Sequence, residues 1–362
     1  MATFIIMHET VKGYDAIGND IEFMYNIIKE KHECYIYAKH QLNTRLTYID
    51  EEKLDEFLDS KDTIIIYHHS TYWEFGYEKL KKAKGRVIVK YHNITPGAFF
   101  EPYNESYFVQ CQEGRELTDT LQKEFPEFFW ISDSEYNNNE LTIVKEDRKL
   151  ICPPFNMIEE WHKAKPDKKI LSKLEKSDDL NVLFVGRVVP NKGHFMLMNV
   201  LQSYCAHYDN HIKLRLVGKF DTAISGYKEI ILDMIEEYGL ESNVEFIGEV
   251  NDNTLMAYYQ GSDVMLCCSE HEGFCVPVIE AQSLGLPVVA RKSSAVPDTL
   301  GADQLVFGEN VEEYVAALHY IKNNDVTALK EAGKRNYESH YTYDVIREIF
   351  IRQIKQIKGV EL

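Results

Sequence analysis

Two glutamates, Glu272 and Glu280, stand eight positions apart on either side of a strand-to-helix turn. The run 263–268 before them is typical of a buried parallel strand, and Pro277 suits the first turn of a helix. A helix N-terminus presents unpaired N–H groups and a partial positive charge, which favour a bound anion such as phosphate. The residues therefore predict a phosphate site whose neighbouring carboxylates bind sugar or ribose hydroxyls.

A second segment carries the cations that such an anion requires. Residues 184–193 read as a strand, a Gly186-Arg187 turn and a Lys192-Gly193 helix start. A guanidinium can bind phosphate oxygens through two parallel hydrogen bonds, and a lysine adds a mobile point charge. In order and spacing, the two segments together resemble the retaining glycosyltransferases of family 4, whose signature is Glu-x7-Glu in this local setting.

The resemblance implies transfer of a hexosyl unit from a nucleoside-diphosphate sugar to a glycan or lipid-linked acceptor, with retention at the anomeric carbon. Arg187 and Lys192 would bind the diphosphate, Glu280 the ribose and Glu272 the sugar. The residues expected to bind the donor are Gly186, Arg187, Lys192, Ser269, Glu272, Gly273, Phe274, Cys275, Val276 and Glu280. Mannose as the sugar, and a role in cell-surface polysaccharide or glycoconjugate synthesis, follow from general similarity to polysaccharide-building members.

In the first half of the chain, His92 directly follows a predicted strand. Family members place a histidine there against the donor sugar, so the resemblance adds His92 to Arg187, Lys192 and Glu272 as the predicted catalytic set. The alternative for such a histidine is a structural residue in a Pro-ended turn. Three further histidines near strand ends, His8, His68 and His69, are weaker candidates for ligand contact.

Three loops keep alternative interpretations. Gly13 and Gly18 lie where family members carry a tighter glycine pair near the phosphates, so this loop either shapes the acceptor pocket or simply starts a helix. Gly248 and Val250 are assigned to the nucleotide base, through backbone contacts that leave the base open. The segment 132–137 resembles a late turn of the family's first domain, but its Ser and Asp are also ordinary helix caps, and we favour the caps.

The chemistry implied by the resemblance requires no metal. Because the family has no settled nucleophilic carboxylate, we expect a front-face reaction in which the leaving phosphate helps to deprotonate the acceptor. No Asp-x-Asp sequence occurs in the chain, so Arg187 and Lys192 take the role of a cation. We expect no cofactor. The alternatives are a catalytically inactive nucleotide-sugar-binding protein, or an epimerase or phosphorylase of the same fold.

Composition limits the class of protein. A chain of 362 residues exceeds what one core usually supports, so two domains are expected. The net charge of −18 argues against general nucleic-acid binding, which needs a basic face. Seven cysteines without metal-ligand pairing suit a reducing cytosol. We expect a cytoplasmic protein, at most peripheral to the inner face of a membrane. The basic cluster between Lys79 and Arg86 could dock on an anionic membrane, but we interpret it as a solvated helix end.

Apolar strand-like runs alternate with helical patterns through both halves, as in parallel sheets covered by helices. Strands are predicted at 3–7, 34–38, 63–67, 86–90 and 128–131, then at 181–186, 212–217, 243–247, 263–268, 287–290 and 304–306. The fold class is α/β, and the resemblance makes it GT-B: two doubly wound Rossmann-like domains facing a central cleft. The expected parts are an acceptor-side domain over 1–155, a connection over 156–178, a nucleotide-sugar domain over 179–340 and a helix over 341–362 that crosses back.

Overall fold

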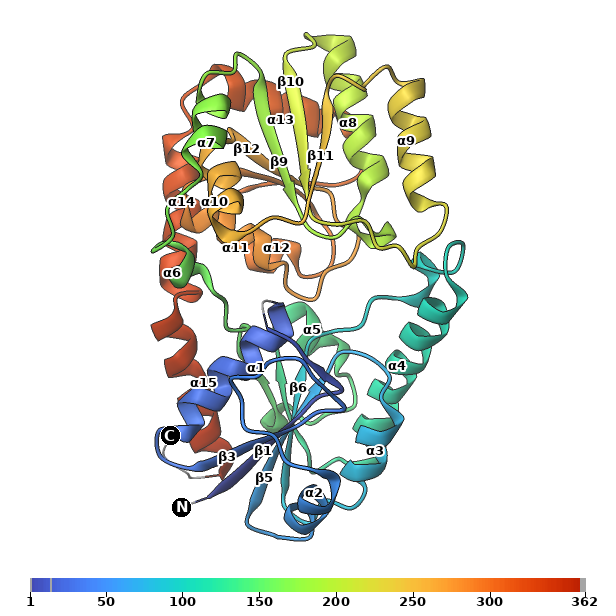
Figure 1. Cartoon of the computed structure of the whole chain (residues 1–362), viewed down its shortest axis with the longest axis vertical. Helices are drawn as coiled ribbons and strands as arrows, with labels where there is room; N and C mark the ends of the chain where they lie inside the picture. The colour runs from blue at the N-terminus through green and yellow to red at the C-terminus, as the bar shows by residue number, and fades with distance from the viewer. Residues whose placement is uncertain (1, 14, 359–362) are drawn as a thin grey trace. The chain divides into compact units, whose positions relative to one another are not determined.

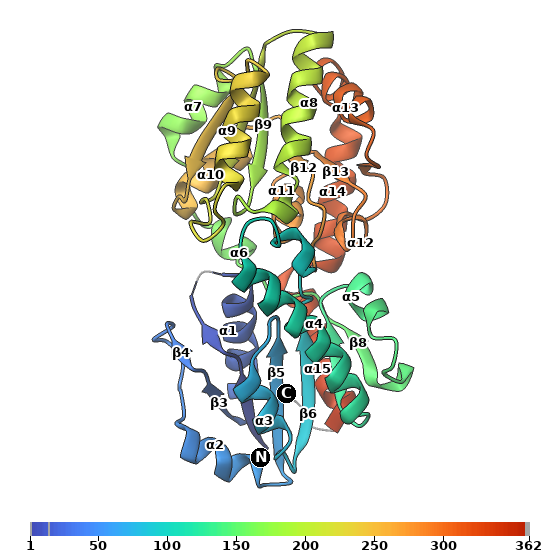
Figure 2. The same cartoon turned by 90° about the vertical axis from the view of Figure 1, so that its right-hand side faces the viewer.

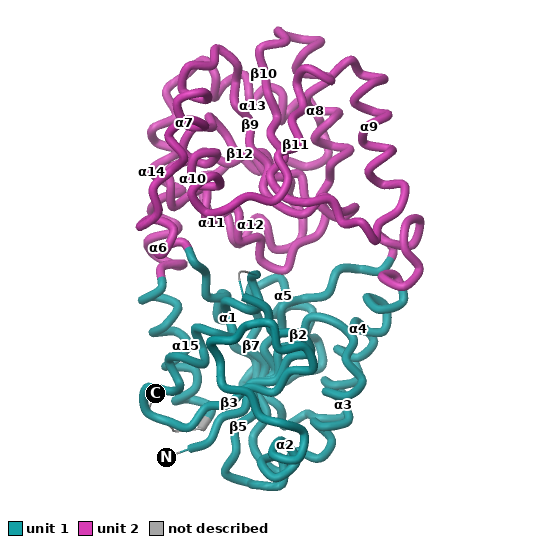
Figure 3. The backbone as a smooth tube through the Cα atoms, in the orientation of Figure 1, with its two compact units in different colours: residues 1–97, 109–157, 343–362 teal, residues 98–108, 158–342 magenta. Residues whose placement is uncertain are grey.

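The computed structural model describes residues 2–13 and 15–358, and they divide into two compact units (Figure 3). Unit 1 comprises the described residues of 1–97, 109–157 and 343–362, and unit 2 comprises 98–108 and 158–342. A short segment of the first half, 98–108, therefore packs with unit 2. Tyr14 of the predicted glycine loop and residues 359–362 of the predicted last helix lie outside the described residues, and the domain limits stated above stay a prediction.

Unit 1 is built on a six-stranded parallel sheet in the order β3-β1-β5-β6-β7-β8 (Figure 1). Its strands are β1 Thr3–Met7, β3 Glu33–Tyr37, β5 Thr63–His69, β6 Arg86–Tyr91, β7 Phe129–Ser132 and β8 Lys149–Ile151. Two residues each of β2 (Thr10–Val11) and β4 (His40–Gln41) pair separately beside it. Strands buried on both faces need apolar residues at successive positions, which explains the continuous apolar runs of β1 and β5.

The helices of unit 1 cover both faces of this sheet. They are α1 Ala16–Lys29, α2 Glu51–Leu58, α3 Glu74–Leu80, α5 Glu135–Glu140, α15 Tyr343–Lys358 and most of α4 Glu105–Glu124. Phe4 and Ile6 of β1 share one core with α1 and α15, while Ile5 and Met7 share the other with α2, α3 and α4. Figure 2 shows α3 and α4 on the near side of the strands. Because successive side chains of a strand point to opposite faces of the sheet, β1 contributes to two separate cores.

Unit 2 repeats the plan with a six-stranded parallel sheet in the order β11-β10-β9-β12-β13-β14. The strands are β9 Leu180–Val185, β10 Ile212–Val217, β11 Val244–Gly248, β12 Val264–Cys267, β13 Val288–Arg291 and β14 Leu305–Phe307. The chain builds outward from β9 to β11, then returns to place β12 on the other side of β9. Such a reversal is the switch point at which doubly wound sheets bind ligands.

Helices again cover both faces of the sheet in unit 2. They are α6 Ile158–Trp161, α7 Lys168–Glu175, α8 His194–His207, α9 Tyr227–Glu237, α10 Asp252–Gly261, α11 Val276–Ser283, α12 Val296–Leu300, α13 Val311–Asn323 and α14 Thr327–His340. In Figure 1, α8 and α9 lie on one side of β9–β11, and α7 and α10 on the other. Across the described residues, no helix combines the length and the apolar character needed to cross a bilayer.

Each strand predicted from the sequence overlaps an observed one, so the doubly wound α/β prediction is confirmed. The strands that the sequence did not indicate are β2, β4 and β8, which have two or three residues each. Runs this short carry no periodicity, because their pairing depends on neighbours brought close by the rest of the fold.

Helix α15 is joined to unit 1 by a row of apolar side chains. Ile346, Phe350, Ile354 and Ile357 are buried in the core that also holds Phe155. The Phe350 ring meets the Phe155 ring edge-on, with 6.1 Å between the ring centroids. Spacings of three and four residues place these side chains on one face of the helix.

We predict that Phe350→Ala destabilises unit 1 by about 3–5 kcal/mol, because the substitution leaves a cavity in a packed core. Arg352→Ala on the exposed side of the same helix is the matched control, with an effect close to zero. Urea unfolding followed by tryptophan fluorescence measures both. Equal midpoints for the two variants would show that α15 contributes little to this core.

Candidate functional site

The switch point of unit 2 brings the two predicted donor-binding segments together. β9 and β12 are paired neighbours, with Met265 beside Leu183, and both strands run in the same direction. The loop that follows β9 carries Gly186 and Arg187, and the loop that follows β12 carries residues 269–275. Residues 80 to 90 positions apart in the chain therefore emerge at one edge of the sheet.

Lys192 and Glu272 form the central ion pair of this edge. The Nζ atom of Lys192, at the end of the 3₁₀ turn Pro190–Lys192, lies 2.6 Å from Oε1 of Glu272. Burial alone would lower the pKa of Lys192, but the Glu272 carboxylate outweighs it and the pKa lies above its usual value. The backbone N–H of Glu272 donates to Ser294 Oγ at 2.7 Å. The pair is therefore held at both ends.

Gly193 explains why a glycine follows the lysine. Its φ of 71° lies in the left-handed region, and a Cβ there would stand 1.9 Å from the carbonyl oxygen of Cys268. Glycine lets the first turn of α8 approach the end of β12 that closely. The Lys-Gly pair in the sequence thus combines a charge with a backbone requirement.

Arg187 has a different environment from Lys192. Its side chain is 62% exposed, and Nη1 lies 3.4 Å from Oδ2 of Asp221. A pair this exposed contributes little to stability, so the guanidinium can be redirected toward a ligand at small cost. Gly186 before it has a φ of 153°, and its carbonyl oxygen would lie 2.0 Å from a Cβ on Gly218.

The turn before α11 can bind a ligand through its backbone N–H groups rather than through its side chains. Cys275 precedes the helix at a φ of 78°, and Pro277 stands in its first turn, as the sequence predicts. The Phe274 ring packs against Tyr341 in the core, and the Cys275 sulfur lies 3.8 Å from that of Cys267. Ser269 is also buried. Phe274 and Cys275 can therefore serve an anion only through their N–H groups, at the N-terminus of α11.

Glu280 lies one turn into α11 and is almost fully buried. The hydroxyl of Tyr259, from α10, donates to its Oε2 at 2.5 Å. Burial raises the pKa of Glu280 to about 7, and the Tyr259 hydrogen bond opposes that rise. Tyr259 was not singled out from the sequence, since a tyrosine in a helix usually reads as core.

The segment assigned to the nucleotide base is shaped by glycine. Gly248 ends β11 with a φ of 79°, and its carbonyl oxygen accepts a hydrogen bond from Gly218 N at 2.9 Å. Val250 is partly buried against the core of unit 2. The assignment of these two residues to the base stays a prediction.

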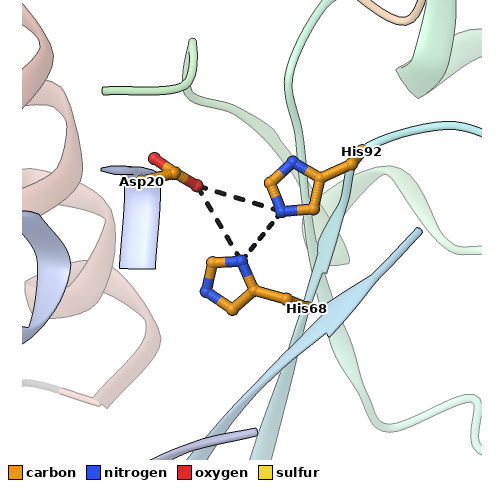
Figure 4. Close-up of side chains that lie close together, drawn as sticks. All are labelled: Asp20, His68 and His92. Atoms are coloured by element: carbon orange, nitrogen blue, oxygen red, sulfur yellow. Dashed lines mark hydrogen bonds and ion pairs between the residues drawn. The ribbon is translucent and has the colours of Figure 1, made fainter. Parts of the chain in front are cut away.

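In unit 1, His92 belongs to a buried network (Figure 4). Its Nδ1 lies 2.8 Å from Oδ2 of Asp133, and its Nε2 lies 2.8 Å from Nδ1 of His68. Lys90 pairs with the other oxygen of Asp133. Oδ2 of Asp20, from α1, lies 4.0 Å from His92 Nε2 and 3.9 Å from His68 Nδ1. Both ring nitrogens of His92 thus have partners inside unit 1.

The sequence did not indicate this network as a whole, although two signals were present. Lys90 interrupts the apolar strand 86–91, and a lysine on a buried central strand requires a carboxylate beside it. Asp20 lies on the same helical face as Ile21 and Met24 and is fully buried. Ser134 caps α5, as expected, but Asp133 serves the network instead.

The glycine loop after β1 has a structural explanation. Gly18 lies in the first turn of α1, where Asp15 Oδ1 accepts its N–H at 2.6 Å. A Cβ on Gly18 would stand 1.7 Å from the carbonyl oxygen of Lys12. Of the two interpretations of this loop, a turn that starts a helix accounts for Gly18. A Cβ on Gly13 would lie 3.8 Å from Arg45 and 4.0 Å from Asn43 among the described residues, which are ordinary contacts.

Comparison with known proteins agrees with the geometry of unit 2. Residues 167–339 match the family model described as glycosyl transferases group 1. These residues therefore form a domain of the glycosyl transferases group 1 family. A relative described as an uncharacterized 41.2 kDa protein in the cps region of Klebsiella pneumoniae is 24% identical over 228 residues, which are 62% of this chain and 58% of that protein. The O-antigen chain mannosyltransferase B of Escherichia coli is 25% identical over 139 residues, 37% of this chain and 34% of that protein.

The chain thus aligns with less than two thirds of the length of these curated relatives. Solved structures match it throughout. HepE of Anabaena, crystallised in complex with UDP, has a TM-score of 0.75 at 14% identity and covers 98% of this chain and 100% of its own. Another structure of HepE holds UDP-glucose. This likeness confirms the GT-B fold across both units.

The basic cluster between Lys79 and Arg86 in unit 1 is balanced by acids. Lys79 pairs with Glu51 and Asp55, Lys81 with Glu78 and Lys84 with Asp59. Attraction to an anionic surface scales with uncompensated charge, so these pairs favour the solvated helix end over membrane docking.

We predict that Glu280→Gln stabilises the protein above pH 7. Between 4.5, its ordinary pKa, and about 7, the folded protein binds more protons at Glu280 than the unfolded chain does, so stability falls as pH rises through this window. The full cost above pH 7 is on the order of 3 kcal/mol. Glutamine keeps an oxygen for Tyr259 and has no charge to bury.

Melting temperatures from pH 5 to 8 measure this effect, with the exposed Glu309→Gln as control. The wild type and the control should lose stability as pH rises, and Glu280→Gln should follow a flatter curve. Parallel curves for all three proteins would show that Glu280 titrates as an exposed carboxyl.

Proposed function

We propose that this protein is a retaining glycosyltransferase that moves a hexosyl unit from a nucleoside-diphosphate sugar to a glycan or lipid-linked acceptor. The observation that carries the proposal is the Lys192–Glu272 pair at the switch point of unit 2, with Arg187 after the neighbouring strand β9. A cation for the diphosphate and a carboxylate for the sugar are thereby available side by side. Glu280 in α11 supplies a second carboxylate for the ribose.

The proposed mechanism depends on charge stabilisation at the departing diphosphate. Negative charge grows on the leaving oxygens as the glycosidic bond breaks, and preorganised cations and N–H groups stabilise that charge without reorganisation. Arg187, Lys192 and the N–H groups of 273–276 take this role, with no metal at the phosphates. Glu272 stays beside Lys192, so its carboxylate is oriented toward sugar hydroxyls without facing the diphosphate as an unpaired charge.

His92 is proposed to act on the transferring sugar. Asp133 holds its Nδ1, which leaves Nε2 as the atom that can meet a ligand. That nitrogen now lies 2.8 Å from His68, so a sugar hydroxyl must take the place of His68 at Nε2.

The sugar and the pathway are proposed from the relatives. The Escherichia coli relative is named a mannosyltransferase of the O-antigen chain, and the Klebsiella relative lies in a cps region. Mannose and the synthesis of a cell-surface polysaccharide are the proposal these names support. The mannose donor we propose is GDP-mannose. HepE was solved with UDP and with UDP-glucose, so a UDP sugar is the first alternative to it.

We predict that Lys192→Ala and Arg187→Ala each lower turnover strongly while the fold persists, because each removes a charge needed most as the phosphate departs. Lys163→Ala, an exposed lysine paired with Glu160, is the matched control and should keep wild-type turnover. A thermal-shift screen of UDP, GDP and ADP sugars first selects the donor. Radiolabelled transfer then measures turnover, and near-normal rates for both variants at saturating donor would exclude this diphosphate site.

Product analysis in the same assay separates the competing functions. Donor binding without hydrolysis or transfer would identify an inactive binding protein, and an isomerised donor would identify an epimerase. Turnover that requires inorganic phosphate would identify a phosphorylase.

We predict that substitution of Glu280 affects nucleotide binding, whereas substitution of His92 affects sugar transfer. Glu280→Gln should weaken binding of the free nucleoside diphosphate by roughly 1.5–3 kcal/mol, the value of a charge-assisted hydrogen bond. His92→Ala should leave that affinity unchanged and lower turnover, because its partner is the transferring sugar. Calorimetry of the nucleoside diphosphate, paired with initial rates, measures both. Equal loss of nucleotide affinity in the two variants would contradict this division of roles.

A further inference from the structure

The network around His92 lies at the switch point of the other sheet. In unit 1 the chain places β3 on one side of β1 and β5 on the other, so the strand order reverses between β1 and β5. His68 is near the end of β5 and His92 directly follows β6, its neighbour. Asp20 reaches the same place from α1. This is the edge at which doubly wound sheets bind ligands.

Three potential ligand atoms converge there. Among the described residues, Asp20, His68 and His92 form the one group of His, Cys, Asp and Glu whose candidate metal ligands all lie within 4.8 Å of one another. The atoms are Oδ2 of Asp20, Nδ1 of His68 and Nε2 of His92, and Figure 4 shows them directed toward a common point. They come from three different elements, so only the fold assembles them.

The hydrogen bonds around the three residues orient these atoms. Oδ1 of Asp20 accepts the Phe155 N–H at 2.9 Å, whereas the buried Oδ2 has no hydrogen-bond partner among the described residues. Nδ1 of His92 is held by Asp133, which places the lone pair of a neutral imidazole on Nε2. A carboxylate behind a ligating histidine, and a hydrogen bond behind a ligating carboxylate, are the supports that metal ligands usually have.

We propose that Asp20, His68 and His92 bind one divalent transition-metal ion in unit 1. Two imidazole nitrogens and one carboxylate oxygen are a ligand set that zinc accepts, with water completing a tetrahedron. Tetrahedral zinc at about 2.0–2.1 Å separates its ligands by roughly 3.3 Å, so the two imidazoles part slightly and Oδ2 of Asp20 moves closer. Of the three side chains, only that of His92 keeps any exposure, 6%, so an ion would reach the site from the His92 side.

Charge supports a cation at this point. The surroundings contain the carboxylates of Asp20 and Asp133 and one ammonium, that of Lys90, which pairs with Asp133. A carboxylate at Asp20 has no direct ionic partner there, and such a buried charge is costly unless a cation or a proton balances it. A proton shared by His68 and His92 is the competing cation. Nε2 of His68 lacks a hydrogen-bond partner in either case and does not discriminate between them.

The metal site goes beyond the proposed transfer reaction and is independent of the donor diphosphate in unit 2. A metal on Nε2 of His92 and a sugar hydroxyl on the same nitrogen exclude each other. Removal of the ion therefore leaves the proposed transfer chemistry intact. The sequence predicted no metal in this protein, so the proposed ion departs from that prediction, and it lies in the other unit from the diphosphate site.

The test uses the full-length, untagged protein, stripped with a chelator and then freed of it. Calorimetry with zinc chloride should show one tight equivalent for the wild type. Asp20→Asn and His68→Gln should lose that equivalent, and His69→Gln should keep it, because His69 is an adjacent buried histidine whose Nε2 is bonded to Thr118 at 2.8 Å. Asp133→Asn should weaken the equivalent 10–100-fold through the orientation of His92.

Two further measurements make the outcome independent of activity. Cobalt should give the visible absorption of a four-coordinate site in the wild type and in His69→Gln only. Zinc should raise the melting temperature of the same two proteins, and a zinc-free circular dichroism spectrum and melting curve like those of the wild type show that the variants remain folded. Absence of a tight equivalent in the wild type, or the same equivalent in all variants, would overturn the proposal, and the first result would assign a shared proton to the cluster.

Discussion

In a parallel sheet whose strand order reverses, the loops that follow the two strands at the reversal diverge and leave a gap between them. Helices on either side of the reversal leave on opposite faces, so the loops that follow the two central strands are not covered by a crossover. In unit 2 these loops follow β9 and β12, and in unit 1 the reversal falls between β1 and β5. The polar side chains of the donor site and of the His92 network lie at these two positions. Elsewhere the ends of the strands lead into helices that pack on the sheet.

The donor edge of unit 2 has to hold charge in a partly buried place. Lys192 and Glu272 meet this demand by pairing, and the pairing raises the pKa of Lys192 where burial alone would lower it. Glu280 meets it differently: without a cation beside it, its pKa rises to about 7. A carboxylate poised in this way costs stability in the free protein, and a bound polyhydroxylated ligand can repay the cost by donating hydrogen bonds.

In unit 1 the same physical demand produces a network. Lys90 lies within a buried strand and is tolerated because Asp133 follows the neighbouring strand β7. Asp133 in turn fixes His92, and His92 meets His68. The charge of Lys90 thus orients Asp133, and Asp133 orients the His92 ring, whose Nε2 faces Asp20. The proposed sugar contact and the proposed metal site both use this one nitrogen, so the network determines what His92 can bind.

The sequence by itself determined the α/β class, the strands longer than three residues and the order of Arg187, Lys192, Glu272 and Glu280 around a strand-to-helix turn. These features are local: apolar runs, a proline in a first helical turn and a glycine after a lysine follow from backbone sterics and solvent avoidance within a few residues. The spacing from Glu272 to Glu280 is likewise fixed within one turn and one helix. A single chain therefore displays them without its fold.

Only the tertiary structure decided which distant residues share an environment. Asp20, His68, Lys90, His92 and Asp133 come from separate elements, and each alone reads as an ordinary cap, core residue or strand end. Their meeting depends on strand order and register, which long-range packing sets. The same holds for the short strands β2, β4 and β8 and for Tyr259 beside Glu280. Burial and pairing energies depend on these neighbours, so the raised pKa of Glu280 could not be predicted from the sequence.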